Sequence, residues 1–398
     1  MGSVETAQAR SRHDLVLVGG GLQNGLIALA CFERRPELRI AMIERAPEIG
    51  GNHTWAIHPR DLPAAARGFA AALITHRWAG YDVRFPNLAR TLHAPYAAIT
   101  SRRLADVVSA AFAGRPGSRL LLGRAARAVH ADHVELDDGE RIRGALVIDA
   151  RGPSAPALEA RPATSEPPHP GCGFQKFFGL EVDLAGEHGL SRPILMDATV
   201  PQHGGFRFFY VLPFGPRRLL VEDTVFARSP VLDLERSRAA VLEYASRFGR
   251  VDAIVRSEQG VLPMPFVPAA PARLASPLAA GYQGGWFHPA TGYSFPAAIR
   301  LACHVAEHAP DRVLGPALHA LARAHRRQSR YAEQLNRLLF TCFAADAMWN
   351  VFARFYRLPE PLIHRFYALS LTPVDRARIL FGRPPRGFSL TRAWRAAR

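Results

Sequence analysis

A glycine-rich turn near the beginning of the chain constrains the fold more than any other feature of the sequence. The apolar run 14–18 predicts a buried parallel strand, three glycines follow it at 19–21, and the segment 26–35 has the pattern of an amphipathic helix. A second apolar run at 39–44 predicts another strand, which ends at Glu44. Strand, glycine turn, helix and strand with a terminal acid together predict a βαβ unit that binds a dinucleotide.

Each residue of this turn has a physical task. Gly19 allows a tight turn, and Gly21 lets the backbone approach a pyrophosphate, which the free N–H groups at the start of the helix also attract. Glu44 is expected to accept hydrogen bonds from the adenosine ribose. An acid at this position disfavours a 2′-phosphate, so FAD or NAD is expected rather than NADP. Asn24 replaces the third glycine of the usual motif, and Gly25 follows one position later.

Two later segments favour FAD. The apolar run within 145–153 predicts a strand that ends at Asp149 and continues to Gly152, late in the first dinucleotide-binding unit. The segment 281–302 is a glycine-rich loop containing Gly292, and a helix is expected to follow it. The N-terminus of such a helix suits the pyrimidine edge or ribityl chain of a flavin, although each segment taken alone is also compatible with a structural turn.

The chain carries an excess of positive charge, with 50 Lys and Arg against 34 Asp and Glu in 398 residues. Residues 301–398 hold sixteen arginines and six acidic residues, interspersed with aromatic side chains. Such a region suits an anionic membrane surface, nucleic acid or acidic ligands, and a solvated helical face is the simpler alternative. Nucleic-acid binding has no motif to support it and is not expected. The aromatic residues are Phe352, Phe355, Tyr356, Phe366, Tyr367 and Trp394.

Composition excludes several classes of protein. An apolar fraction of 48% and a charged fraction of 21% are those of a globular chain. No apolar run reaches the ~18 residues of a transmembrane helix, and the first residues lack the apolar segment of a secretory signal, so neither is expected. Four widely spaced cysteines indicate a reducing compartment, and no metal site is expected.

Several motifs are more specific than the glycine turn. They are GGNHTW at 50–55, VIDARGP at 147–153, LLVEDTVF at 219–226, WFHPATGYSFP at 286–296 and LFGRPP at 380–385. Together with GGGLQNGLIAL at 19–29, they make the chain resemble the bacterial lycopene β-cyclases, from about residue 14 to about residue 387. Asn24 in the glycine turn is also what this family shows.

The resemblance implies an FAD-dependent enzyme that cyclises the ψ end groups of lycopene to β-rings, giving β-carotene through γ-carotene. It implies reduced flavin as the active form, NAD(P)H as the electron source, and no net redox change in the carotenoid. It also implies a peripheral enzyme on the cytoplasmic face of the bacterial membrane, with an anionic membrane surface and other carotenoid-pathway enzymes as partners.

The expected fold is mixed α/β. A Rossmann-like FAD-binding domain of the glutathione-reductase and hydroxylase type is interleaved with an antiparallel-sheet substrate domain, and helices follow. The FAD-binding domain is expected from 1–60, 98–165 and 270–315, and the substrate-binding domain from 61–97 and 166–269. Residues 316–398 are expected to form a helical, basic, membrane-associating region.

The implied chemistry is an isomerisation, which requires an acid to protonate a terminal double bond and a dry cavity that stabilises the resulting cation. Glu222 follows an apolar run, and strand alternation sends its neighbour Asp223 to the opposite face. By resemblance, the functional glutamate of the family falls on Glu222. A structural acid that pairs with Arg217 or Arg218 is the alternative, and Asp197 is the second catalytic candidate.

The remaining site residues are assigned partly by resemblance. Arg103, at the start of a helix, resembles the flavin-contacting arginine of related oxidoreductases. His288 is expected near the flavin, and a loop histidine bonded to backbone is the alternative. The expected cofactor-binding residues are Gly19, Gly21, Asn24, Gly25, Glu44, Arg103, Asp149, Gly152, His288 and Gly292. The expected substrate-binding residues are His53, Trp55, Phe206, Phe208 and Tyr210, for which ordinary core packing is the alternative.

Other functions share this fold. A flavin monooxygenase or a prenyl or carotenoid reductase changes the mass of its product, whereas cyclisation does not. A non-catalytic carrier of prenyl lipids is disfavoured by the intact glycine turn with Glu44.

Overall fold

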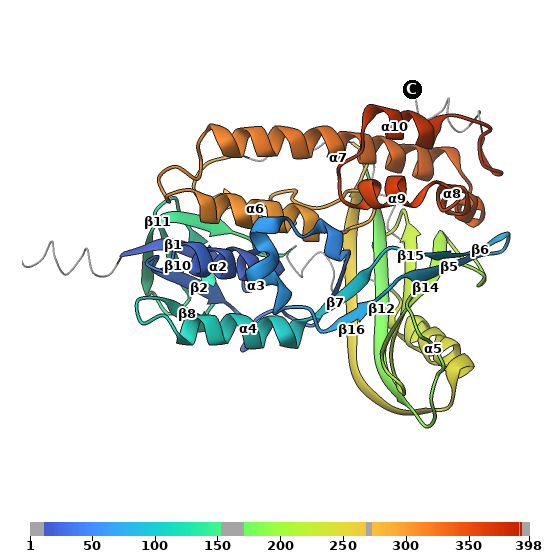
Figure 1. Cartoon of the computed structure of the whole chain (residues 1–398), viewed down its shortest axis with the longest axis horizontal. Coiled ribbons are helices and arrows are strands. Elements are labelled where there is room, and N and C mark those ends of the chain that lie inside the picture. Colours follow the sequence, from blue (N-terminus) through green and yellow to red (C-terminus); the bar gives the residue numbers. More distant parts are fainter. Residues whose placement is uncertain (1–11, 153–170, 268–272, 390, 392–398) are drawn as a thin grey trace, which may run out of the picture.

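Two seven-stranded sheets form the frame of the chain, and they are joined by a smaller sheet and covered by helices (Figure 1). A computed structural model describes residues 12–152, 171–267, 273–389 and 391. The first eleven residues, where no secretory signal is expected, lie outside the described residues, as does Trp394.

The first sheet contains the predicted βαβ unit. Its order is β8-β2-β1-β11-β10-β9, with β17 beside β11. β1 pairs in parallel with both β2 and β11, which places the glycine turn after β1 at the centre of the sheet. The strands are β1 Arg12–Val18, β2 Ile40–Glu44, β8 Arg119–Leu122, β9 Ala126–Val129, β10 His133–Leu136, β11 Arg141–Asp149 and β17 Leu278–Ala279.

Helices cover one face of this sheet, because their apolar faces pack on its buried strands. α2 is buried along most of its length and packs against α6, which arrives from late in the chain. The helices of this layer are α2 Leu22–Arg34, α3 Arg67–Ala71, α4 Ser101–Ala113 and α6 Phe295–Glu307. Short 3₁₀ turns are η1 Pro59–Asp61 and η2 Ala64–Ala66.

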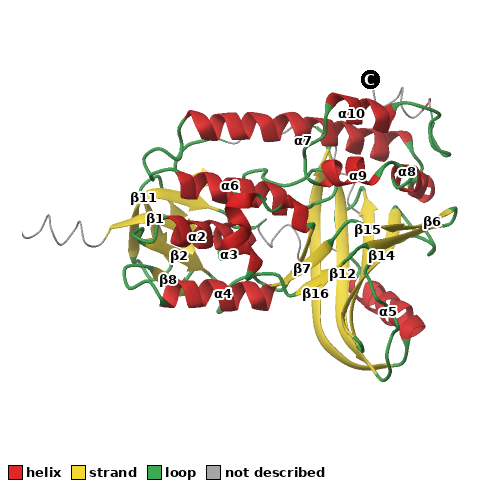
Figure 2. Ribbon diagram, viewed as in Figure 1, coloured by secondary structure: helices red, strands yellow, loops and turns green. Residues whose placement is uncertain are grey.

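The second sheet is mostly antiparallel, in the order β16-β12-β15-β14-β13-β5-β6. β12 and β16 are its longest strands, and Figure 2 shows them curving through the whole height of this half. α5 Leu234–Ala245 covers one face. The strands are β5 Tyr81–Phe85, β6 Leu88–Leu92, β12 Cys172–Leu184, β13 Ile194–Asp197, β14 Phe206–Gly215, β15 Arg218–Ala227 and β16 Val251–Pro265.

A three-stranded sheet connects the two halves. Its order is β3-β7-β4, and its strands come from both sides of the expected boundaries at residues 60/61 and 97/98. The division into two sequence-defined domains therefore stays a prediction. The strands are β3 Thr54–Ile57, β4 His76–Trp78 and β7 Tyr96–Thr100.

The C-terminal region is helical, as predicted. α7 Pro316–Cys342 runs along both halves of the molecule, and three shorter helices lie over the second sheet (Figure 1). These are α8 Trp349–Phe355, α9 Glu360–Tyr367 and α10 Pro373–Leu380, with short 3₁₀ turns η4 Ser246–Phe248 and η5 Ala345–Ala347 elsewhere. Among the described residues, none of the helices combines the length and apolar character needed to cross a bilayer.

The mixed α/β fold class is confirmed, with a parallel dinucleotide-binding sheet, an antiparallel sheet and C-terminal helices. The individual strands predicted at 14–18, 39–44 and 145–153 are present as β1, β2 and the end of β11. Local apolar runs were sufficient to predict these strands, because each strand is buried on both faces.

Candidate functional site

A cavity of about 1520 Å³ extends from the glycine turn of the first sheet to the C-terminal helices. Ordinary small-molecule pockets occupy roughly 300–1,000 Å³, so this cavity has room for two ligands or one long one. Its two ends differ in chemistry. One is formed by glycines and polar groups around β1 and β2, and the other by aromatic and aliphatic side chains of β14, β15, α8 and α9.

The polar end has the geometry that a dinucleotide requires. Gly19 adopts a φ of 96°, which favours glycine, and its N–H donates to the carbonyl of Ile43 at 2.8 Å. Gly21 also lines the cavity, and a Cβ on it would meet nothing within 4 Å. The turn therefore leaves open space beside the backbone at the N-terminus of α2, where a pyrophosphate fits.

Glu44 closes this end. Its Oε2 accepts the Gly20 N–H at 2.6 Å, and its Oε1 accepts the Ala46 N–H at 2.8 Å, so the carboxylate is held at the cavity wall. Each oxygen retains a lone pair for a ribose hydroxyl.

Asn24 and Gly25 support the turn from behind and do not line the cavity. The Asn24 Nδ2 donates to the carbonyls of Val18 at 2.9 Å and Gly19 at 2.8 Å, and the side chain is fully buried. A Cβ on Gly25 would lie 3.0 Å from Leu104, so glycine permits the close approach of α2 to α4. Asn24 thus takes the place of the missing glycine by fixing the turn through hydrogen bonds.

The later flavin-associated segments also reach this cavity. Gly152 and Gly292 line it, and Gly292 has a φ of 68°. Asp149 does not line the cavity, and its Oδ2 accepts a hydrogen bond from the Arg151 Nη2 at 2.7 Å. Ser294 and the first residue of α6, Phe295, bring the N-terminus of that helix to the cavity wall.

Arg103 and His288 are not at the cavity, contrary to expectation. Arg103 lies on the solvent face of α4, and its Nε donates to the carbonyl of Ala72. His288 is buried and bonded to backbone, with Nε2 3.0 Å from the carbonyl oxygen of Phe366 and Nδ1 accepting the Ala290 N–H. Burial lowers the pKa of His288 to about 3, so it is neutral. These hydrogen bonds connect the loop that contains His288 to α9.

Two of the expected substrate-binding residues, Phe208 and Tyr210, line the apolar end, whereas Phe206 does not. Phe206 lies on the same face of β14 as these two residues but does not reach the cavity. Its ring stacks on that of Phe352 of α8, with the ring centroids 4.0 Å apart. The Tyr210 hydroxyl lies 3.1 Å from that of Tyr96. His53 and Trp55 line the passage between the two ends, with ring centroids 6.3 Å apart.

The C-terminal aromatic residues complete the apolar end, and this was not anticipated. Phe352, Phe355, Phe366 and Tyr367 line the cavity, and Tyr356 is fully buried. Interpreting them as surface residues of the basic region was wrong. Phe355 and Tyr356 follow Phe352 by three and four residues, and this spacing is the signal that indicated an inward helical face.

Glu222 faces the cavity from β15, opposite Tyr210 of β14. Its Oε1 accepts the Thr224 Oγ1 hydroxyl at 2.7 Å. Burial is the main cause that raises its pKa to about 8, and the neighbouring carboxyl of Glu258 raises it further. Glu222 is therefore a carboxylic acid that keeps its proton near neutrality in an apolar wall.

The alternative role, that of a structural acid paired with an arginine, applies to Asp223 and not to Glu222. Asp223, on the opposite face, pairs with Arg207 at 2.8 Å, and Arg218 pairs with Asp183 at 2.8 Å. Strand alternation thus separates an ion-paired carboxylate from a carboxyl that faces an apolar cavity.

Asp197 does not line the cavity. Its Oδ2 accepts the Tyr244 hydroxyl of α5 at 2.7 Å, and it lies 3.8 Å from Arg84. The neighbouring Leu195 and Met196 of β13 contribute to the cavity wall. Asp197 therefore fastens α5 to the sheet on its opposite face.

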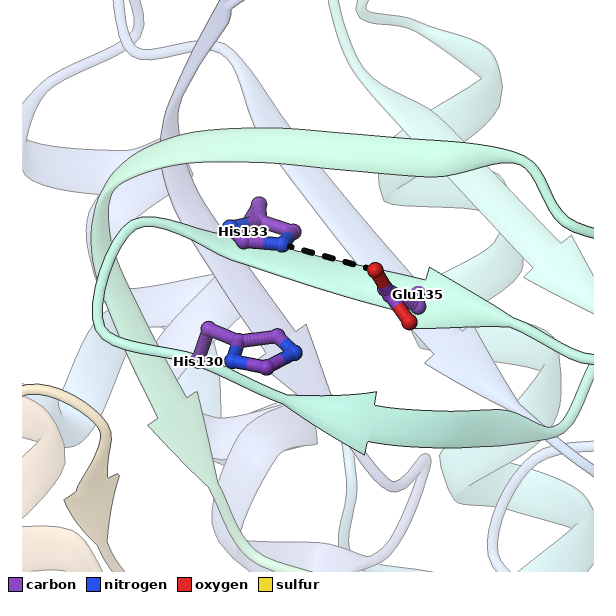
Figure 3. A group of neighbouring side chains, drawn as sticks. All are labelled: His130, His133 and Glu135. Atoms are coloured by element: carbon purple, nitrogen blue, oxygen red, sulfur yellow. Dashed lines mark ion pairs between the residues drawn. The ribbon is translucent and has the colours of Figure 1, made fainter.

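A separate cluster lies on the hairpin formed by β9 and β10. Figure 3 shows His130, His133 and Glu135, whose possible ligand atoms lie within 4.8 Å of one another. Both oxygens of Glu135 are already engaged at 2.9 Å, by Arg127 and by Arg141. Two guanidinium groups neutralise this carboxylate and repel a cation, so we assign no metal to the cluster.

Known proteins are similar to this chain along nearly its whole length. A family model described as "Lycopene cyclase protein" matches residues 14–393. A "Lycopene beta-cyclase" from Pantoea ananas is 43% identical over 380 residues, which cover 94% of this chain and 95% of the relative. Another, from Paracoccus sp., is 38% identical over 381 residues, which cover 94% of each chain.

Solved structures with much lower identity share the fold. A geranylgeranyl bacteriochlorophyll reductase-like protein from Thermoplasma acidophilum aligns with a TM-score of 0.58 at 14% identity, covering 97% of this chain and 96% of its own. PqsL from Pseudomonas aeruginosa, in complex with 2-aminobenzoylacetate, aligns with a TM-score of 0.59 at 18% identity, covering 87% and 100%.

Proposed function

The chain belongs to the lycopene cyclase family, and from this premise we propose that it cyclises the ψ end groups of lycopene to β-rings. The single observation that carries the proposal is Glu222, an acid with a raised pKa in the apolar wall of a long cavity. The products are γ-carotene after one cyclisation and β-carotene after two.

Glu222 is the proposed general acid. Its proton goes to the terminal double bond of the polyene, the electron pair of the neighbouring internal double bond closes the six-membered ring, and a ring carbon then releases a proton. Phe208 and Tyr210 line the same space, and their aromatic rings would stabilise positive charge near them. The apolar wall excludes water, which would otherwise capture the cation.

FAD is the proposed cofactor, and the polar end of the cavity fits it. Gly19, Gly21 and the N-terminus of α2 would hold the pyrophosphate, Glu44 the ribose, and Gly152, Gly292 and the N-terminus of α6 the flavin side. When bound in its reduced form, with NAD(P)H as the electron source, FAD supplies negative charge that stabilises the carbocation without net redox change. Asn24, Gly25 and Asp149 act indirectly, by fixing the loops around it.

We place the enzyme on the cytoplasmic face of the membrane. Its substrate is a wholly apolar polyene, and two residues that line the cavity, Leu338 and Leu380, are also exposed at the surface. Phe381, next to Leu380, is 78% exposed. Arginines of the same region favour an anionic surface, at ~1 kcal/mol each, and other carotenoid-pathway enzymes are proposed neighbours there.

Pigment analysis tests the activity directly. Expression of the chain in cells that accumulate lycopene is expected to give cyclic carotenoids with the mass of lycopene. A product whose mass differs by oxygen or hydrogen atoms would instead indicate a monooxygenase or a reductase. Unchanged lycopene together with a colourless purified protein would support a lipid carrier.

Glu222→Gln tests the acid. The amide retains the shape but has no acidic proton, so cyclisation is expected to fall by at least about 100-fold. Flavin absorbance and melting temperature should remain near those of the parent protein. Full activity in a folded, flavin-loaded variant would overturn the assignment.

A further inference from the structure

Gly179 lies between two glutamates on adjacent strands. It lies near the middle of β12, and it stands directly opposite Glu222 on β15 and Glu258 on β16. Residues directly opposite in antiparallel strands share one face of the sheet, so both carboxyl side chains rise on the face that Gly179 occupies. A Cβ at Gly179 would lie 3.4 Å from the Glu222 Cβ and 3.3 Å from the Glu258 Cγ.

The missing side chain leaves room for the two carboxyls to approach each other above Gly179, and the nearby carboxyl of Glu258 is one cause that raises the pKa of Glu222. A hydrogen bond between two carboxyl groups requires that one of them holds a proton. The surroundings decide which one does. Burial raises the pKa of Glu258, but its Oε2 accepts hydrogen bonds from the Arg256 Nη1 at 2.6 Å and the Thr54 hydroxyl at 3.0 Å, and both partners oppose this shift by favouring the charged form.

Glu222 has no such cation among its described neighbours, where its hydrogen-bond donor is the hydroxyl of Thr224. Glu258 is buried and does not line the cavity, whereas Glu222 does. The two carboxyls therefore differ in role: one is exposed to the substrate, and the other is held behind it by an arginine.

We propose that Glu258 is a positioning residue that keeps one proton on Glu222, as the charged half of a carboxyl–carboxylate pair formed across Gly179. The inference rests on the proposed function of Glu222 as the acid. After Glu222 has given its proton to the polyene, two adjacent carboxylates remain and repel each other. The isomerisation consumes no proton overall, because the ring carbon releases one, and this repulsion favours the return of a proton to the pair.

Other titratable groups around the pair do not replace this effect. Tyr96 of β7 and Tyr210 of β14 face Glu222, but burial raises their pKa values and they stay neutral. Asp223 is neutralised by Arg207 on the opposite face. The other groups lie on the Glu258 side of the pair. Thr54 of β3 and Arg256 of β16 donate to Glu258, and Arg256 also donates to Glu181 of β12. His53 is nearby and neutral.

Glu258→Gln removes the negative charge and keeps the shape. In the flavin-loaded full chain, the alkaline limb of the kcat/KM profile for lycopene is expected to move to lower pH by about one unit or more, because a like charge no longer holds the proton on Glu222. Flavin content and KM should change little. Glu258→Asp keeps the charge and is expected to restore much of the parent profile.

Glu181→Gln is the matched control. Glu181 also bonds Arg256, at 2.7 Å, but stands on β12 two residues beyond Gly179 and away from the cavity. Its variant should keep the parent profile. An unshifted alkaline limb in folded Glu258→Gln, or an equal shift in both variants, would overturn the proposal.

Gly179→Ala provides a second test if Glu258→Gln folds poorly. The added methyl group separates the carboxyls without changing any charge, and the same shift to lower pH is expected. Absence of a shift in this variant contradicts the pair. All these measurements presuppose a parent protein that cyclises lycopene, so failure of the proposed function shows itself separately, as absence of product in the parent.

Discussion

At the scale of single residues, the site depends on how a sheet separates neighbours. Glu222 and Asp223 are adjacent in the chain, but one faces an apolar cavity and the other an arginine 2.8 Å away. The same functional group in two environments gives an acid that faces the cavity and a carboxylate that is paired with an arginine. Chemical role is thus assigned by the strand face and not by the residue itself.

The pH dependence of the parent enzyme follows from this separation. The active form of Glu222 is protonated, and its pKa is raised to about 8, so activity is present below this range and is lost as the pH rises through it. A profile of kcat/KM against pH, with flavin occupancy checked at each point, measures this limb. Activity that continues to increase through the range would contradict an acid role for Glu222.

Sequence reasoning reached Glu222 because an apolar run followed by two acids is a local signal, and because the functional glutamate of the resembled family falls on this position. It could not reach Glu258, whose relation to Glu222 depends on the register of three strands. Asp197 and Arg103 show the opposite error. Both have suitable chemistry, but Asp197 meets Tyr244 of α5 and Arg103 meets solvent, and neither orientation is encoded in a short motif.

At the scale of elements, the turn between β1 and α2 is the most sharply defined feature. Its two strands were predicted to within two residues, because a parallel strand buried on both faces gives a continuous apolar run, whereas α2 begins four residues before the predicted start of the helix. The aromatic residues of α8 and α9 were misplaced because charge and aromaticity were considered without helical spacing. Which face of these helices points inward depends on the sheet beneath them.

Gly21→Val tests the turn. The protein around Gly21 leaves room for a side chain, so the variant is expected to fold, but the added methyl groups occupy the proposed path of the pyrophosphate. Flavin affinity is expected to fall by at least about tenfold, which is ~1.4 kcal/mol. Gly186→Val is the control, since a Cβ there is equally free and Gly186 lies outside the cavity. Undiminished flavin content in Gly21→Val would remove the turn from the cofactor site.

At the scale of the whole molecule, one cavity joins the first sheet to the C-terminal helices, and its apolar end reaches the surface near exposed leucines. The residues that identify this opening come from α7, α10 and the segment that follows. Only the folded chain brings them together, so the sequence predicted a basic region but not an entrance.

Phe381→Ser tests whether this opening docks on a membrane. Phe381 is 78% exposed and does not line the cavity, and inserting a Phe side chain into lipid contributes ~1.5 kcal/mol or more, so binding to anionic vesicles is expected to weaken by about tenfold. Added salt should weaken the binding of the parent protein further. Leu234→Ser, at an exposed position of α5, should bind like the parent. Equal binding by Phe381→Ser and the parent would contradict docking through this face.

The aromatic residues of α8 and α9 have a practical consequence for anyone who engineers this chain. The helices above the second sheet supply both the outer surface near the opening and the inner wall of the cavity. A truncation that removes these helices, made to improve handling of the protein, would therefore open the cavity to water and remove part of its lining. Solubility and catalysis cannot be tuned independently by deletion here, and substitutions on the outward faces of these helices are the safer route.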